Sequence, residues 1–89
     1  MGLMFTMPTV LEQDGFQIKV FLPPREHGPA HVHGYKAGGV AVITLPDATQ
    51  SLTIRSVSKP MRNADVVAAV RLVEAHVETC WIHWRKYHG

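Results

Sequence analysis

The sequence predicts an α+β domain in which an antiparallel β-meander of about five strands packs against one long C-terminal helix. Two observations carry this prediction. Short β-prone runs separated by turn residues fill positions 9–57, and an apolar stripe of helical period fills positions 64–88. The connections between the runs are too short for a helical crossover, so the strands should pair in antiparallel hairpins.

The first hairpin is the clearest element. Runs 9–13 and 16–22 flank Asp14-Gly15, a dipeptide suited to the positive φ angles of a type I′ turn. Pro23-Pro24 must end the second run, because proline has no N–H to give to a sheet. Alternation should bury one face of this run, which carries Phe16, Ile18, Val20 and Leu22.

Three further strands are expected over residues 31–35, 40–45 and 50–57. The first two are joined through Lys36-Ala37-Gly38-Gly39, and the last two through the turn Pro46-Asp47-Ala48-Thr49. Gly, Pro and Asp favour tight turns for distinct conformational reasons, so both connections should be short and exposed.

The C-terminal segment predicts a single helix from about Ala64 to His88. Asn63 is the expected N-cap, Asp65 complements the positive helix end, and Arg85 and Lys86 complement the negative end. Such a helix is ~36 Å long and would cross the whole sheet. Its apolar stripe, spaced by four and three, is Val66, Val70, Val73, Val77, Cys80 and Trp84.

The 89-residue length allows one domain, expected over residues 7–89, with residues 1–6 as a flexible extension. A core of this size has little stability in reserve, so a homodimer or a protein partner would support it. The single Cys80 excludes an internal disulfide and fits the cytoplasm. No apolar run reaches roughly 18 residues, so we expect no membrane association. The formal charge of +2, without a dense basic run, is weak evidence for nucleic acid.

Chemistry-bearing side chains concentrate in residues 26–33, Glu-His-Gly-Pro-Ala-His-Val-His. If His31 and His33 begin a strand, the period of two places both rings on one face, with backbones ~6.6 Å apart. Two such imidazoles can chelate zinc or another divalent transition metal, with His27 or Glu26 as a further ligand. A lone His-x-His is a loose signal, so we expect no cofactor and keep metal as the alternative.

The same two histidines can instead act as general acid and base in phosphodiester cleavage, with Lys36 or Arg25 steadying the phosphate. A purely structural interpretation stands beside this one. In it both histidines hydrogen-bond backbone groups next to the proline turn, His27 caps the loop, and Glu26 forms a surface ion pair. The residues themselves leave these alternatives open.

The chain resembles the small bacterial domain of unknown function 4160 at four places. They are Met7-Pro8-Thr9, Gly15-Phe16, residues 26–33, and Trp84 with His88-Gly89. Ala30 stands where a second proline is common in that family. The resemblance implies a stand-alone bacterial or phage-related protein, often encoded beside a companion of the domain of unknown function 2442 type in what look like toxin-antitoxin pairs. It implies no reaction.

We therefore expect a toxin-antitoxin type component that binds a small protein partner through a sheet edge or the helix. One alternative is an RNA-directed phosphodiesterase or metal-dependent hydrolase that uses residues 26–33. The other is a nucleic-acid-binding regulator that uses the basic helix end at Arg85, Lys86 and His88. The nearby Trp81, Trp84 and Tyr87 fit a core better than a platform for bases.

Overall fold

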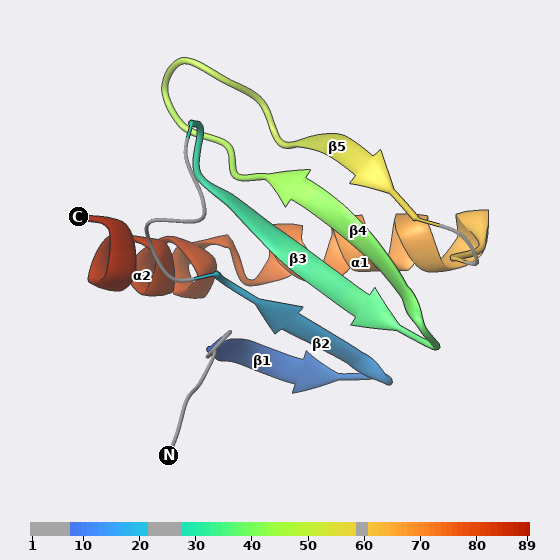
Figure 1. Ribbon diagram of the computed structural model, residues 1–89. Coiled ribbons are helices and arrows are strands. Elements are labelled where there is room, and N and C mark those ends of the chain that lie inside the picture. The colour runs from blue at the N-terminus through green and yellow to red at the C-terminus, as the bar shows by residue number, and fades with distance from the viewer. Residues whose placement is uncertain (1–7, 22–27, 59–60) are drawn as a thin grey trace.

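The computed structural model describes residues 8–21, 28–58 and 61–89, which form a five-stranded sheet and two helices (Figure 1). The strands lie side by side in chain order, and every neighbouring pair is antiparallel. The α+β class and the five-stranded meander are therefore confirmed. The strands are β1 (Thr9–Gln13), β2 (Phe16–Lys19), β3 (His31–Lys36), β4 (Gly39–Thr44) and β5 (Thr53–Val57).

Tight turns set the register of the hairpins. Asp14-Gly15 has φ angles of 54° and 82°, as the expected type I′ turn requires, and Ala37-Gly38 repeats this pattern with 50° and 84°. Between β4 and β5, the Asp47 carboxylate accepts hydrogen bonds from the backbone N–H groups of Thr49 at 2.7 Å and Gln50 at 2.9 Å. Hydrogen bonding, led by the Thr49 N–H, lowers the pKa of the Asp47 carboxyl below its usual range.

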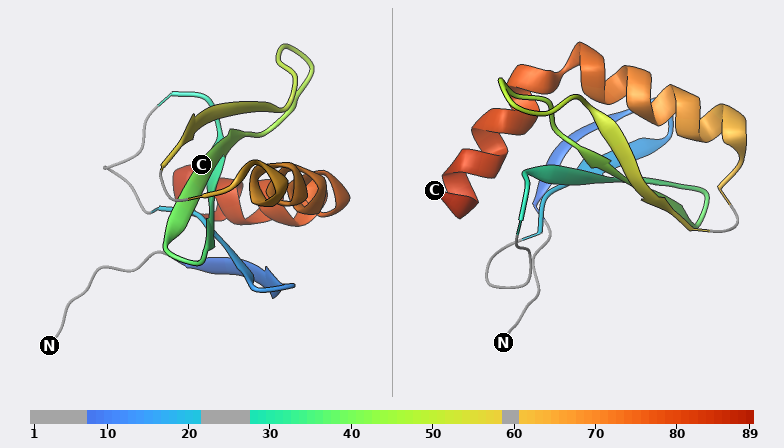
Figure 2. Two further views of the ribbon diagram at one scale, coloured as in Figure 1. Left: turned by 90° about the vertical axis from the view of Figure 1, so that its right-hand side faces the viewer. Right: turned by 90° about the horizontal axis from the view of Figure 1, so that it is seen from above.

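The sheet buries one face against α1 (Asn63–Ala75), and α2 (Val77–His88) lies at one end of the sheet (Figure 2). The expected burial of the β2 face is confirmed, although Leu22 lies outside the described residues. None of the helices in the described part of the chain is long and apolar enough to span a membrane. The buried apolar residues of the strands and their ends are Phe16, Ile18, Val20, Ala30, Val32, Ala41, Ile43 and Leu45, and those of α1 are Val66, Ala69, Leu72 and Val73.

The prediction of one long helix is wrong, because the helix breaks at His76. This residue has φ −125° and ψ 30°, outside the helical region. Its N–H donates to the carbonyl of Val73 at 3.1 Å, and its own carbonyl accepts from the N–H of Cys80 at 3.0 Å, so a new helix starts at once. Figure 2 shows α2 turned away from the axis of α1.

The break lets the second half of the helical stripe reach the core. A continuous helix over residues 63–88 would be about 39 Å long, whereas a strand of six residues spans about 20 Å. The last turns of a straight helix would therefore run past the sheet. In the bent arrangement Cys80 is fully buried, and the indole N–H of Trp81 donates to the carbonyl of Pro46 at 2.9 Å.

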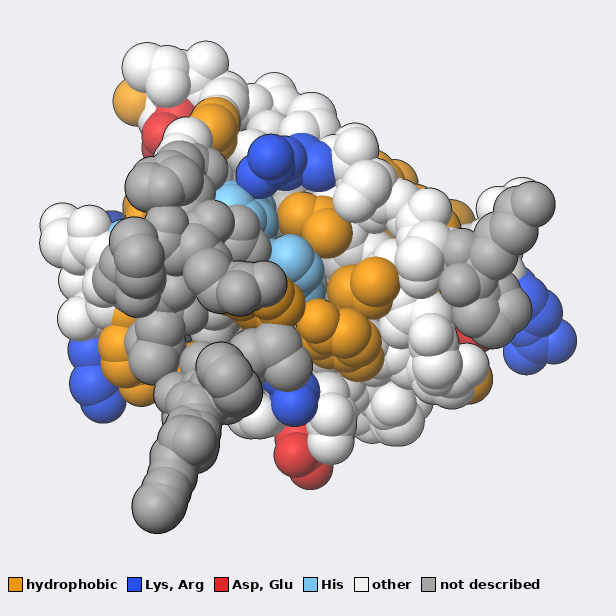
Figure 3. Space-filling view, viewed as in Figure 1, with side chains coloured by type: hydrophobic (Ala, Val, Ile, Leu, Met, Phe, Trp, Pro, Cys, Tyr) orange, Lys and Arg blue, Asp and Glu red, His pale blue; other side chains and the backbone are white. Residues whose placement is uncertain are grey.

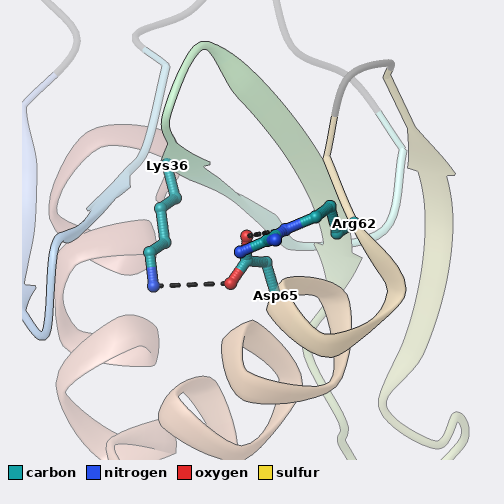
Figure 4. Close-up of polar contacts among 3 residues, drawn as sticks. All are labelled: Lys36, Arg62 and Asp65. Carbon is teal, nitrogen blue, oxygen red and sulfur yellow. Dashed lines mark ion pairs between the residues drawn. The ribbon is translucent and has the colours of Figure 1, made fainter.

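The start of α1 is stabilised by charge, and the predicted Asn63 cap is wrong. The flanking residue is Arg62, which makes no side-chain cap bond, and Asn63 is already helical. Asp65 occupies the first turn as expected. Its carboxylate faces the ammonium of Lys36 at 3.4 Å and the guanidinium of Arg62 at 3.9 Å (Figure 4).

The end of α2 agrees with the sequence prediction. Arg85, Lys86 and His88 lie in its last turn, where cations complement the negative end of the helix dipole. Gly89 follows with φ +89°, and its N–H donates to the carbonyl of Arg85 at 3.1 Å. A residue with positive φ at this position is the common way for a helix to end.

Gly39 packs directly against Met61, which precedes α1. A Cβ atom on Gly39 would lie 2.7 Å from the Cβ and 2.9 Å from the backbone nitrogen of Met61. We expect Gly39→Ala to lower the free energy of unfolding by about 1–3 kcal/mol, because backbone cannot move aside as a side chain does. Gly34→Ala should cost less, since its Cβ would meet the flexible Cδ1 of Ile18 at 3.3 Å. Urea unfolding of both variants tests this order, which an equal or larger loss for Gly34→Ala would contradict.

Candidate functional site

The two histidines of β3 lie on the face of the sheet opposite α1. Val32 and Gly34 face α1, since Val32 is part of the core and a Cβ on Gly34 would lie 3.7 Å from Ala69. Alternation turns His31 and His33 to the other side, where their ring centroids are 5.4 Å apart. The expectation that both rings share one face is confirmed.

His31 is held by the chain that precedes β3. Its side chain is only 2% exposed, and its Nδ1 lies 2.8 Å from the carbonyl oxygen of Pro29. The guanidinium of Arg55 lies 3.1 Å from the same nitrogen. A guanidinium only donates and a carbonyl only accepts, so one nitrogen cannot satisfy both. We therefore place the imidazole hydrogen on Nδ1, where it donates to the closer carbonyl of Pro29. The guanidinium of Arg55 then packs against the ring.

This geometry is the backbone hydrogen bond that the structural interpretation of the sequence expected for His31. His33 is the more exposed of the pair, and its ring stacks on Phe21 with centroids 4.1 Å apart and planes inclined by 18°. Buried and bonded through Nδ1, His31 is better placed to orient its neighbours than to touch a substrate. The acid-base role of the pair stays a prediction.

Six rings form a continuous chain of contacts, which we call the ring cluster. From His33 it extends to Tyr35, with centroids 6.4 Å apart. In the other direction it passes from His31 to Trp84 at 5.2 Å and on to His88, stacked on Trp84 at 3.8 Å. The members of the ring cluster are Phe21, His31, His33, Tyr35, Trp84 and His88.

The ring cluster fastens α2 to the end of the sheet. The Nε2 of His88 lies 2.6 Å from the carbonyl oxygen of Phe21, just beyond β2, so this nitrogen carries a hydrogen and donates it. Sequence reasoning placed Trp84 in the core and His88 in a basic helix end, and did not place either beside His31. The family resemblance could have indicated this grouping, because its motif residues include Trp84 and His88 as well as residues 26–33.

We call the side of β2–β5 that faces away from α1 the open face. Val42 and Lys19 lie on it, since each pairs directly with His33. Figure 3 shows histidines bordered by hydrophobic side chains at the centre of this face, with Lys or Arg on two sides. The cations on this side are Lys19 and Arg55, and the strands β2–β5 contain no Asp or Glu. The neighbouring β1 brings a carboxylate to the same side, because Glu12 pairs with Gln17 and accepts a hydrogen bond from its amide at 3.4 Å.

Lys36, predicted as a binding residue, does not join the histidines. It is an even number of positions from Val32 and Gly34 and therefore points to the α1 side, where its ammonium pairs with Asp65 and lies 4.7 Å from the ring centroid of Phe16. The structure thus places the Lys36 ammonium away from the histidine pair, and a phosphate contact from Lys36 stays a prediction. The other predicted binding residues, Arg25, Glu26 and His27, lie outside the described residues.

Metal binding gains no support from the described residues. Among them no group of three or more His, Cys, Asp or Glu side chains is placed to hold an ion. The further ligands suggested by the sequence, Glu26 and His27, fall in the segment that is not described. A metal held by His31 and His33 stays a prediction.

Comparison with known proteins adds no relative, because no protein-family model, curated protein or solved structure matches the chain. The resemblance to the domain of unknown function 4160 therefore rests on its motif residues alone. Function has to be argued from the surfaces of the molecule.

Cys80 offers a probe of how firmly the ring cluster holds α2. It is fully buried in α2, and burial raises the pKa of its thiol to about 11. Labelling by a thiol reagent at about pH 8 should therefore be slow and should report the opening of α2. His88→Ala removes the bond to Phe21, and we expect it to speed labelling about 5- to 10-fold, equivalent to about 1 kcal/mol.

His83→Ala is the matched control for this experiment. The Nδ1 of His83 lies 3.0 Å from the carbonyl of Thr79, one turn earlier in the same helix, so this contact ties α2 to nothing else. The control should leave the labelling rate of Cys80 unchanged. Equal acceleration by both variants would mean that the ring cluster does not fasten α2.

Proposed function

We propose that this chain is a component of a toxin-antitoxin type module and that it binds a small protein partner by strand pairing at β5. The observation that supports the proposal is the edge position and the exposure of β5. β5 is an edge of the sheet, and all five of its residues are exposed, including Ile54 at 47% and Val57 at 43%. An edge strand offers unpaired backbone N–H and C=O groups to an incoming strand.

Exposed apolar side chains continue from β5 onto α1. Ile54 and Val57 each pair with a buried residue of β4, so they face the α1 side of the sheet. Val67 of α1 is 50% exposed and lies two helical turns from Glu74, which lines a hollow with the β4–β5 connection. Val67 therefore lies on the β5 side of α1. A partner strand at β5 gains apolar contacts as well as backbone hydrogen bonds.

Charge favours a different protein over a second copy of this chain. Arg55 is the central residue of β5, so antiparallel pairing of two copies about the strand centre would bring the two Arg55 residues together. The fitting strand instead has apolar side chains toward α1 and a carboxylate toward Arg55. The family resemblance suggests where to look for it, in a companion of the domain of unknown function 2442 type encoded beside this chain.

The exposed isoleucines provide a test with a matched control. Ile54→Lys places a charge in the apolar contact, and it should weaken binding of the purified neighbouring gene product at least about 10-fold. Ile82→Lys makes the same change at 57% exposure on α2 and should leave affinity unchanged. Both variants should unfold within about 0.5 kcal/mol of the original protein, since both sites are exposed. Titration calorimetry measures the affinities.

Three outcomes of this titration would contradict the proposal: no binding by the original chain, unchanged binding by Ile54→Lys, or equal losses in both variants. Membership of a toxin-antitoxin module is tested separately, by the growth of cells that express the two proteins. Expression of one member alone should slow growth, and co-expression of its partner should restore it. Normal growth with either member expressed alone would remove the toxin-antitoxin assignment and leave strand pairing as a property of β5.

A further inference from the structure

A hollow of about 550 Å³ lies between the β4–β5 connection and the junction of the two helices. Its volume is within the range of roughly 300–1,000 Å³ in which protein sites enclose a ligand. Its lining includes two acidic residues, Asp47 and Glu74, and the apolar residues Pro46, Leu52 and Val77. We call it the acidic hollow. Because Leu52 directly precedes β5 and packs against the core, the acidic hollow adjoins the exposed edge at β5.

The carboxylate of Asp47 is ionised and has an oxygen to offer. Hydrogen bonds, led by the Thr49 N–H, hold the pKa of this carboxyl below its usual range. The N–H and hydroxyl of Thr49 and the N–H of Gln50 all donate to the same oxygen, Oδ1. Among the described residues none donates to Oδ2, so this second oxygen is available to a ligand.

Glu74 stands where a helix normally carries a cation. It lies in the last turn of α1, which contains no basic residue, and the helix dipole makes this end negative. Arg71 is one turn earlier on the same side of α1, but within the described part of the chain Glu74 forms no ion pair. A carboxylate at this end is unfavourable for the helix, and a departure from a local rule is typical of functional sites.

The charged groups on the surrounding elements leave the acidic hollow negative. Glu78, in the first turn of α2, adds a further carboxylate one turn after Glu74. Neither Arg71 nor His76, which flank Glu74 in sequence, lines the acidic hollow. On α2 the guanidinium of Arg85 lies over an indole ring, 5.4 Å from its centroid. The cation of β5, Arg55, is on the open face, on the other side of the sheet. A ligand for the acidic hollow is therefore a cation.

We infer that the acidic hollow holds an arginine side chain that the partner carries beside its pairing strand. This inference rests on the proposed pairing at β5. A guanidinium donates to several acceptors at once, and its weakly hydrated plane packs on apolar groups, so it fits two carboxylates beside apolar walls better than an ammonium does. A metal ion fits less well, because no group of three or more His, Cys, Asp or Glu among the described residues is placed to hold one.

Strand geometry indicates where this arginine lies in the partner. Ile54 faces the α1 side and follows Leu52 by two positions. In a paired strand, the residue opposite Ile54 and the residue two positions nearer to Leu52 point the same way, about 6.6 Å apart. The arginine should therefore share the face of the partner's apolar side chains, at the end of its strand that lies beside Leu52. The carboxylate that meets Arg55 lies on the opposite face.

The test is titration calorimetry with the purified neighbouring gene product and the variant Glu74→Gln, which keeps the side-chain size and removes the charge. We expect binding about 3- to 10-fold weaker, between the effects of an exposed ion pair and an enclosed charged hydrogen bond. The loss should shrink at high salt, which screens the pair. The urea midpoint should not fall, because the charge is unfavourable at this helix end. A loss of affinity through lost structure would lower that midpoint and contradict the inference.

Glu12→Gln is the matched control. It makes the same change on β1, at the edge of the sheet opposite to β5. The net charge of the two variants is equal, so any long-range attraction between the proteins falls equally in both. Affinity should change less than about 2-fold in Glu12→Gln, because no contact with the partner is lost. Equal losses in Glu12→Gln and Glu74→Gln would overturn the inference.

A double-mutant cycle identifies the occupant. Replacing the partner's arginine by Gln should weaken binding to the original chain and leave binding to Glu74→Gln nearly unchanged, because both changes remove one contact. No binding by the original chain would overturn the proposed function and this inference together. Two results would overturn the inference alone and leave strand pairing at β5 intact: binding lost in Ile54→Lys but unchanged in Glu74→Gln, or coupling of Glu74 to no arginine of the partner.

Discussion

The break at His76 is the constraint from which the rest of the arrangement follows. Because α2 turns there, Trp84 reaches the ring of His31, and His88 donates to the carbonyl of Phe21. These contacts tie the end of β2 and the start of β3 to the C-terminus, across 67 positions of the sequence in the case of Phe21 and His88.

Sequence reasoning predicted the sheet well because hairpins are local. Asp14-Gly15 adopts the positive φ angles of its turn, and the alternation in β2 buries Phe16 and Ile18. The helix break could not be predicted in this way, since residues 75–77 contain neither Gly nor Pro and the gain comes from distant contacts of α2. The Asn63 cap failed for a related reason: the ion pairs of Asp65 hold the same helix end.

The candidate site was predictable only in part. The period of two in a strand correctly placed His31 and His33 on one face of the sheet. The same rule, applied to Lys36, would have placed that lysine on the opposite face. Arg55 was not predictable, because it lies at an irregularity in the pairing of β4 with β5. Val42 pairs with Ser56 and Ile43 with Ile54, so Arg55 is the unpaired residue between them. This bulge turns the guanidinium toward His31.

The exposed edge strand and the apolar side chains beside it form one surface, because Ile54 and Val57 of β5 face the α1 side of the sheet. The most direct test is an NMR titration of the labelled chain with the purified neighbouring gene product, read at the backbone amides. Strand pairing at β5 predicts that the largest shifts fall on residues 53–57, with smaller shifts at Val67 of α1, while β1 at the opposite edge stays unchanged. Shifts concentrated at β1 or at residues 85–88, or spread evenly over the molecule, would contradict the claim that β5 is the binding surface.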